Sequence, residues 1–176
     1  MAKKKRKNNK NQGPSQQAGP STTSNSNDRC SWWNQFSGFT PNPYAGVAKE
    51  FDRLAEFMGW TGKEFRKRKT EAYEAEFNFH FVHGKSKLET WRELCAEVGV
   101  ESGGSITQCK KNLKGVLINI VNLLNHRRNP AVTLIKFATF RQFRDSTMRS
   151  GNMINREMAK EDGFLRVFLR VLRGKA

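Results

Sequence analysis

The chain has 176 residues, of which 32 are Lys or Arg and 16 are Asp or Glu, so its formal net charge is +16. No apolar run approaches the roughly 20 residues that a bilayer-spanning helix needs, and three cysteines without a Cys-x-x-Cys pair disfavour a disulfide framework and a structural zinc site. We therefore expect neither a secreted nor an integral membrane protein. The charge favours a polyanionic partner: nucleic acid first, an anionic membrane surface second, an acidic protein third.

Residues 1–30 are predicted to form a disordered basic tail. Up to Asn27 the chain has no Leu, Ile, Val, Phe, Trp or Tyr, so it cannot bury enough apolar surface to offset the entropy of ordering. The tail carries one compact basic cluster, namely Lys3, Lys4, Lys5, Arg6 and Lys7. Such clusters are bound by nuclear import receptors, which predicts a nuclear protein. The alternative is that the cluster only keeps the chain in solution.

The composition changes abruptly at residues 31–44, which we expect to form an aromatic and proline-rich arm. Its aromatic residues are Trp32, Trp33, Phe36, Phe39 and Tyr44. Aromatic rings pack in a protein core or stack on nucleic-acid bases. Because no basic residue lies between Ser31 and Lys49, we expect these rings to pack on the helical domain rather than on bases.

Residues 31–174 are predicted to form a single all-α domain, a compact bundle of about five to six helices. Four Ser/Thr-x-x-Glu/Gln capping boxes begin at Thr61, Ser86, Ser105 and Thr139. Apolar residues at a spacing of 3.6 follow them. We expect helices over 43–58, 61–84, 86–99, 105–129, 140–149 and 155–173, with the fourth running unbroken until Pro130. The β-branched stretch 131–135 is expected to be an extended connector or a short strand.

The segments 94–100 and 105–111 have the rhythm of a helix-turn-helix motif, with a glycine at the turn and a polar start to the second helix. Ser105, Thr107, Gln108, Lys110 and Lys111 are residue types that contact phosphates or base edges. The connection 101–104 is about three residues too long for the tight turn of this motif. An ordinary corner between two packed helices would give the same pattern.

Positive charge is concentrated in residues 102–176, which hold fifteen basic and four acidic residues. Near the end of the chain three arginines recur at i, i+4 and i+7, on one face of the last expected helix. Because acidic residues are scarce at neighbouring positions, we expect few intramolecular partners and phosphate contacts instead. The candidate nucleic-acid-binding residues are Lys110, Lys111, Lys114, Arg127, Arg128, Arg141, Arg144, Arg166, Arg170 and Arg173.

The sequence offers no pattern typical of catalysis. His80 and His83 are three residues apart, but neither a carboxylate pattern nor a cysteine accompanies them, so we expect no metal. Cys95 and Cys109 fall on apolar helix faces and are expected to be buried. Phosphate-binding loops and nucleophile elbows are absent. We therefore expect a protein without enzymatic activity and without a cofactor.

Several stretches together resemble a group of small, basic, helical proteins that recur in filamentous fungi. The resemblance covers about residues 36–172. It rests on Gly-Phe-Thr-Pro-Asn-Pro (38–43), Glu-Phe-x-Arg-Leu-Ala (50–55), Gly-Trp (59–60), Leu-Glu-x-Trp-x-x-Leu-Cys-x-Glu-Val-Gly-Val (88–100), Ser-Ile-x-x-Cys-Lys-Lys (105–111) and Asp-Gly-Phe-Leu-Arg (162–166). The resemblance implies one coherent helical unit and supplies no catalytic residues.

These observations favour a non-catalytic nuclear protein that binds DNA or RNA through phosphate contacts from its C-terminal half. The alternative is a protein-interaction adaptor. In that case the arginines would bind an acidic partner protein, with Trp32 and Trp33 as the anchor.

Overall fold

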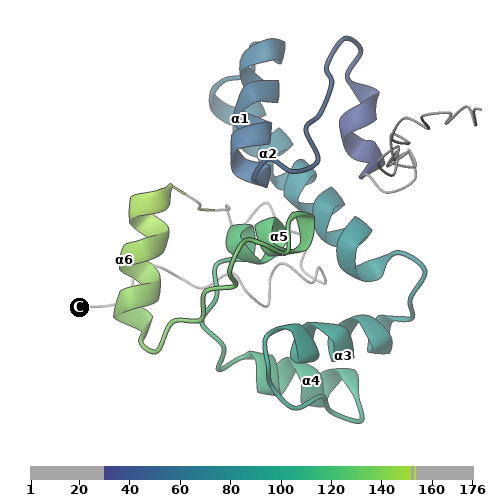
Figure 1. The fold of residues 1–176 in the computed structure, drawn as a ribbon, viewed down its shortest axis with the longest axis vertical. Helices are drawn as coiled ribbons and strands as arrows, with labels where there is room; N and C mark the ends of the chain where they lie inside the picture. Colours follow the sequence, from purple (N-terminus) through teal and green to yellow (C-terminus); the bar gives the residue numbers. More distant parts are fainter. Residues whose placement is uncertain (1–29, 152, 154–176) are drawn as a thin grey trace, which may run out of the picture.

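The fold of the computed structural model, which describes residues 30–151 and Met153, is all-α (Figure 1). The prediction of an all-α bundle is confirmed. In this part of the chain, β-pairing is limited to one isolated bridge, between Ile118 and Lys136. The helices are α1 (Val47–Met58), α2 (Gly62–Phe77), α3 (Lys87–Glu97), α4 (Ile106–Leu113), α5 (Ile120–Arg128) and α6 (Phe140–Ser150), with a 3-10 helix η2 (Ser31–Gln35) and a π-helical turn η3 (Asn78–Val82).

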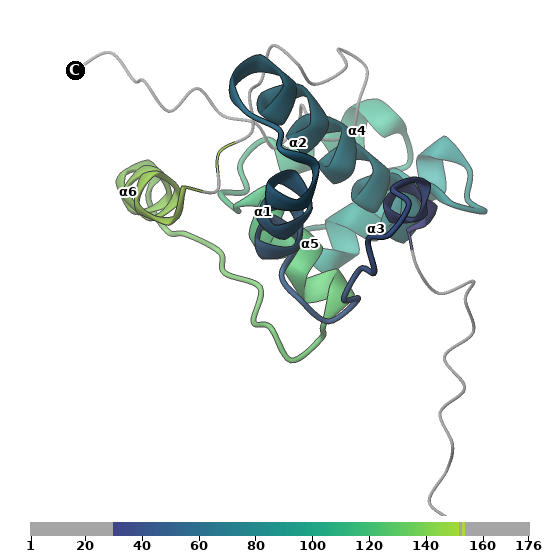
Figure 2. The same ribbon diagram turned by 90° about the horizontal axis from the view of Figure 1, so that it is seen from above.

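Helix α5 lies at the centre of the molecule and packs against α1 and α2 (Figure 1). Helix α3 packs against α4 and against η3, while η2 packs against α2. The core is made of apolar side chains from α1 to α5 together with rings of the arm, and its largest fully buried members include Trp91, Tyr73 and Phe51. Helix α6 lies at the edge of the molecule in both views (Figures 1 and 2).

Three of the four expected capping residues cap a helix. The hydroxyl of Ser86 accepts from the backbone N–H of Glu89, whose carboxylate accepts from the N–H of Ser86, which is the full reciprocal box. Ser105 and Thr139 accept from the backbone N–H three residues later. Thr61 makes no such bond, although α2 begins directly after it.

The expectation of one long helix over 105–129 is wrong. The chain leaves the helix after Leu113, and α5 begins at Ile120. Asn119 separates the two helices, because its side-chain oxygen accepts from the backbone N–H of Val121 at 2.9 Å and caps a new helix. The segment between the helices pairs with the connector after α5, where the N–H of Phe137 donates to the carbonyl of Leu117.

Other boundaries also differ from the expected ones. Helix α1 begins four residues later than expected, at Val47, whose N–H donates to the side chain of Asn125 at 2.7 Å. The second expected helix continues past α2 as η3. Residues 131–135 form an extended connector with turns, and the bridge occurs one residue later, at Lys136. The tail and the helix expected over 155–173 lie outside the described residues.

Candidate functional site

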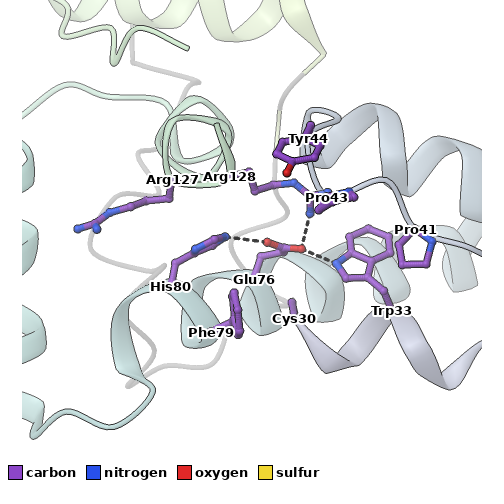
Figure 3. Close-up of a pocket in the computed structure, with 10 residues that line it drawn as sticks. All are labelled: Cys30, Trp33, Pro41, Pro43, Tyr44, Glu76, Phe79, His80, Arg127 and Arg128. Atoms are coloured by element: carbon purple, nitrogen blue, oxygen red, sulfur yellow. Dashed lines mark hydrogen bonds and ion pairs between the residues drawn. The ribbon is translucent and has the colours of Figure 1, made fainter. Parts of the chain in front are cut away.

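A single buried carboxylate, that of Glu76 on α2, joins three parts of the fold. Its side chain is 2% exposed. The indole Nε1 of Trp33 and the Nη1 of Arg128 both donate to its Oε1, and Nε2 of His80 lies 3.2 Å from its Oε2 (Figure 3). Trp33 comes from the arm, His80 from η3 and Arg128 from α5. Glu76 therefore connects α2 and η3 to the arm and to α5.

Arg128 is fully engaged inside the molecule. Its side chain is 5% exposed. Its Nε donates to the carbonyl of Ala45 at 2.9 Å, its Nη2 donates to the carbonyl of Asn42 at 2.8 Å, and its guanidinium carbon lies 5.7 Å from the centre of the Trp33 ring. These bonds fix the loop that precedes α1. Because the charge is buried and paired, Arg128 is not exposed for phosphate contact.

Arg127 is engaged on the opposite side of α5. Its Nη2 lies 2.9 Å from a carboxylate oxygen of Glu93 and 2.8 Å from one of Glu97, both on α3. Its guanidinium also stacks over the ring of Phe81, at 4.5 Å. The expectation that Arg127 and Arg128 lack intramolecular partners is wrong. Their partners Glu97, Glu93 and Glu76 are 30, 34 and 52 positions earlier in the sequence. The scarcity of acidic residues close to Arg127 and Arg128 in the sequence was therefore misleading.

A cavity of about 220 Å³ lies beside Glu76, and we call it the Glu76 hollow (Figure 3). Tyr44, 73% exposed, lies on one side of it and Phe79 on the other. The remaining lining residues are Cys30, Trp33, Pro41, Pro43, Glu76, His80, Arg127 and Arg128. Burial, and secondarily the charge of Glu76, raises the pKa of the Cys30 thiol to about 12. The thiol is therefore protonated at neutral pH and is a poor nucleophile.

A second cavity, of about 760 Å³, lies along the same seam between the arm and α2 with η3, and we call it the Trp32 hollow. Cys30 and Phe79 line both cavities. The other residues of the Trp32 hollow are Ser31, Trp32, Gln35, Ala75, Asn78, Val82 and His83. The two hollows are therefore neighbours, with Phe79 between them.

The lysines at α4 that are expected to bind nucleic acid lie on the surface. Lys110, Lys111 and Lys114 are all exposed, and the ammonium of Lys110 lies 5.2 Å from the centre of the buried Trp91 ring. A cation over an aromatic face is attracted to it but keeps its charge, so Lys110 is held in position without being neutralised.

The connection between α3 and α4 packs closely on the start of α4. A Cβ at Gly103 would lie 2.5 Å from Gln108 Cβ, so only glycine fits there. Gly103 also accepts hydrogen bonds through its carbonyl from Arg92 and from the buried Cys109. The long connection is thus held by contacts within this corner, and Gly103 has a packing role in it.

The arginines of α6 that are expected to bind nucleic acid are also exposed, on a helix apart from α4. Arg141 is 91% exposed and lies 3.9 Å from Asp145, and Arg144 is exposed as well. The opposite side of α6 places Phe143 against Phe137, at 5.8 Å between ring centres. Helices α4 and α6 lie at different edges of the molecule (Figure 1), so the structure does not bring the two basic groups into one cluster. Arg166, Arg170, Arg173 and the basic cluster at residues 3–7 lie outside the described residues.

His80 has a carboxylate partner that the sequence analysis overlooked, because Glu76 precedes it by one helical turn. Cys95 and Cys109 are buried, as expected. Among the described residues, no group of three or more His, Cys, Asp or Glu is placed to bind a metal ion. Within the same part of the chain, no helix is both long and apolar enough to cross a membrane.

Sequence reasoning also missed two surfaces. The first consists of the hollows, whose walls come from segments more than thirty residues apart. The second is a basic face on α2, with the exposed residues Lys63, Arg66 and Lys67. The run of basic residues at 66–69 was the available signal for that face, but acidic residues nearby cancel its charge when it is averaged over residues 30–101.

No protein-family model matches the chain, and no curated protein or solved structure shows significant similarity to it.

Proposed function

We propose that this chain is a non-catalytic protein that binds nucleic acid through phosphate contacts from its C-terminal half. The observation that carries the proposal is the charge of residues 102–151, which hold nine basic residues and one acidic residue, Asp145. Arg127 and Arg128 neutralise carboxylates of the preceding half. The remaining basic side chains, on α4, on α6 and at Lys136, are exposed.

Exposed cations raise the local concentration of polyanions, and each contact with a phosphate releases a counterion. In this proposal the phosphate contacts come from Lys110 and Lys111 on α4, from Lys114 directly after that helix, and from Arg141 and Arg144 on α6. Arg166, Arg170 and Arg173, which lie outside the described residues, are proposed as further phosphate contacts. Because α4 and α6 lie at different edges, a bound nucleic acid would span the molecule or contact the two helices separately.

The proposed location is the nucleus, with the basic cluster at residues 3–7 as the import signal. A fluorescent reporter fused to residues 1–12 should accumulate in nuclei. The matched reporter with all five basic residues changed to Gln should not, and a cytoplasmic signal from the unchanged fusion would contradict this part of the proposal.

The adaptor alternative loses its expected anchor. Trp33 is 2% exposed and donates to Glu76, and Phe36 and Phe39 are buried with it. An interface anchor is a side chain that is free to enter a partner's pocket. Of Trp32 and Trp33, only the half-buried Trp32 is accessible to a partner. For this reason nucleic-acid binding is the proposal and protein binding is an outcome of its test.

The test is a titration of the full chain against fluorescently labelled duplex DNA, single-stranded DNA and RNA at two salt concentrations. Binding should weaken steeply with salt. Changing Lys110, Lys111 and Lys114 to Gln should flatten the slope of log K against log[salt] by roughly 0.7–0.9 for each phosphate contact removed.

The control variant changes Lys63, Arg66 and Lys67 on α2 to Gln, which removes the same charge from another exposed surface. It should change the slope less than the α4 variant does. Equal effects of both variants would show that total charge, and not the basic C-terminal half, controls binding. Saturable 1:1 binding to an acidic protein, with no measurable affinity for nucleic acid, would favour the adaptor.

A further inference from the structure

The seam between the arm and the C-terminal half of α2 with η3 is lined by several aromatic rings. Tyr44 belongs to the Glu76 hollow, Trp32 to the Trp32 hollow, and Phe79 lies between them as a wall of both. The ring of Tyr44 is the most exposed of the three, at 73% of its possible surface. The two neighbouring hollows therefore offer three potential stacking surfaces.

Neighbouring contacts hold the other two rings in fixed orientations. The ring of Trp32 packs edge-on against Trp33 and Phe36, with centres 5.1 and 4.9 Å away. Phe79 contacts the ring of His80 at 5.0 Å. Both Phe79 and His80 belong to the π-helical turn η3, a geometry that is frequent at functional sites. A ligand that stacks on these rings therefore has little side-chain entropy to overcome.

The charges at the Glu76 hollow are already compensated. Glu76 is paired with Arg128 at its floor, and the guanidinium of Arg127 points away from the carboxylate toward its own partners on α3 (Figure 3). A cationic ligand would have to displace Arg128 from both Glu76 and the Trp33 ring, which its remaining bonds to backbone carbonyls oppose. The hollow therefore suits a flat group that is neutral, and the imidazole of His80 and the thiol of Cys30 provide polar edges.

The segment that precedes the hollows in the sequence is basic. Cys30 lines each of them, and the preceding segment, residues 1–29, carries seven basic residues and one acidic residue, with Arg29 adjacent to Cys30. A ligand with neutral flat rings and a negatively charged backbone matches this combination. Single-stranded nucleic acid has that chemistry, because its bases are free to stack and its phosphates are attracted to basic residues. Duplex DNA keeps its bases stacked inside the helix.

We propose that the seam formed by the Glu76 hollow and the Trp32 hollow binds successive unpaired bases of a single-stranded nucleic acid, stacked on Tyr44, Phe79 and Trp32. This inference rests on the proposed function and assigns the single-stranded form as the preferred ligand. The basic residues of α4 and α6 contact phosphates of either form, whereas the seam discriminates between them.

The test measures anisotropy of fluorescein-labelled oligonucleotides of about 12 nucleotides, single-stranded and duplex, with the full chain. Loss of one stacking ring costs about 1–3 kcal/mol, so Tyr44→Ala should weaken single-strand binding by roughly 5- to 150-fold. Its affinity for the duplex should stay within about twofold, because duplex bases do not reach the ring. Tyr44 is the first choice, since its exposed ring is not part of the core.

Phe79→Leu is the second variant, because it keeps an apolar side chain against the core while removing the aromatic face. It should weaken single-strand binding in the same direction, with an unchanged circular dichroism spectrum. Phe57→Ala is the matched control, since Phe57 is an aromatic residue that is 54% exposed and lines neither hollow. Stacking of a base on Trp32 should also quench tryptophan fluorescence during titration with the single strand.

The possible outcomes separate this inference from the proposed function. If the single strand binds with unchanged affinity to Tyr44→Ala and Phe79→Leu while the lysine variant of α4 loses affinity, the seam is not the site, although the chain still binds nucleic acid. Equal affinity of the unchanged chain for single strand and duplex also overturns the seam proposal. If no nucleic acid binds, both proposals fail. If a peptide binds at the seam and no oligonucleotide does, the hollows belong to a protein partner instead.

Discussion

The ion pair between Glu76 and Arg128 gives the sharpest prediction about stability. Glu76→Ala removes the carboxylate that receives both the Arg128 guanidinium and the Trp33 indole. The two charged side chains are 2% and 5% exposed, so Arg128 would lose its carboxylate partner while most of its side chain stays buried. Removing one member of a buried pair costs about 3–5 kcal/mol, because the remaining charge stays buried and uncompensated. We expect a loss of that size in the free energy of unfolding, and a fall in Tm of roughly 10 °C or more.

The assay is urea unfolding followed by far-UV circular dichroism and by tryptophan fluorescence, since Trp33 reports on the same site. Glu76→Gln keeps an oxygen acceptor for Trp33 and removes only the charge, so it should cost less than Glu76→Ala. The control Arg141→Ala removes an exposed ion pair, 3.9 Å from Asp145, and should change stability by less than about 0.5 kcal/mol.

A double-mutant cycle separates the pair from its surroundings. Arg128→Ala alone also loses the bonds to Ala45 and Asn42, so its cost exceeds that of the ion pair. The double variant should nevertheless be more stable than the sum of the two single losses predicts, by on the order of 2 kcal/mol. If Glu76→Ala costs less than about 1 kcal/mol with an unchanged m-value, the carboxylate does not hold the arm to α5 and the argument is refuted.

Three further predictions concern the core, the caps and a thiol. Trp91→Ala should cost about 3–5 kcal/mol in urea unfolding, because the fully buried ring leaves a cavity; a loss below about 1 kcal/mol would contradict its burial. Ser86→Ala should cost about 1 kcal/mol and Thr61→Ala much less, since only Ser86 makes cap hydrogen bonds; equal losses would show that the cap bonds contribute nothing. Because the folded state raises the pKa of Cys30 to about 12 from 9.0, its unfolded state ionises first as pH rises, so stability should fall above about pH 9. That loss should be smaller in Cys30→Ala, as measured by Tm across this range, and identical pH profiles would exclude the thiol as the cause.

The sequence determined the local features because their causes lie within one helical turn. The capping box at Ser86 needs only residues three positions apart, and the extended connector over 131–135 follows from its β-branched composition. The all-α class follows in the same way, from caps followed by apolar residues at a spacing of 3.6. Even the start of α5 had a local cause, since Asn119 is a favourable capping residue, but the continuing apolar pattern concealed it.

Only the tertiary structure decided the candidate site, because its partners are distant in the sequence. Trp33 and Glu76 are 43 positions apart, and Glu76 and Arg128 are 52 apart. Charge counted along the sequence placed Arg127 and Arg128 on a free basic surface, whereas packing of α5 against the other helices turned both toward buried or half-buried carboxylates. The hollows arise in the same way, since they exist only where the arm meets α2 and η3. Periodicity specifies which side of a helix is buried, but not which charged residue another helix brings opposite it.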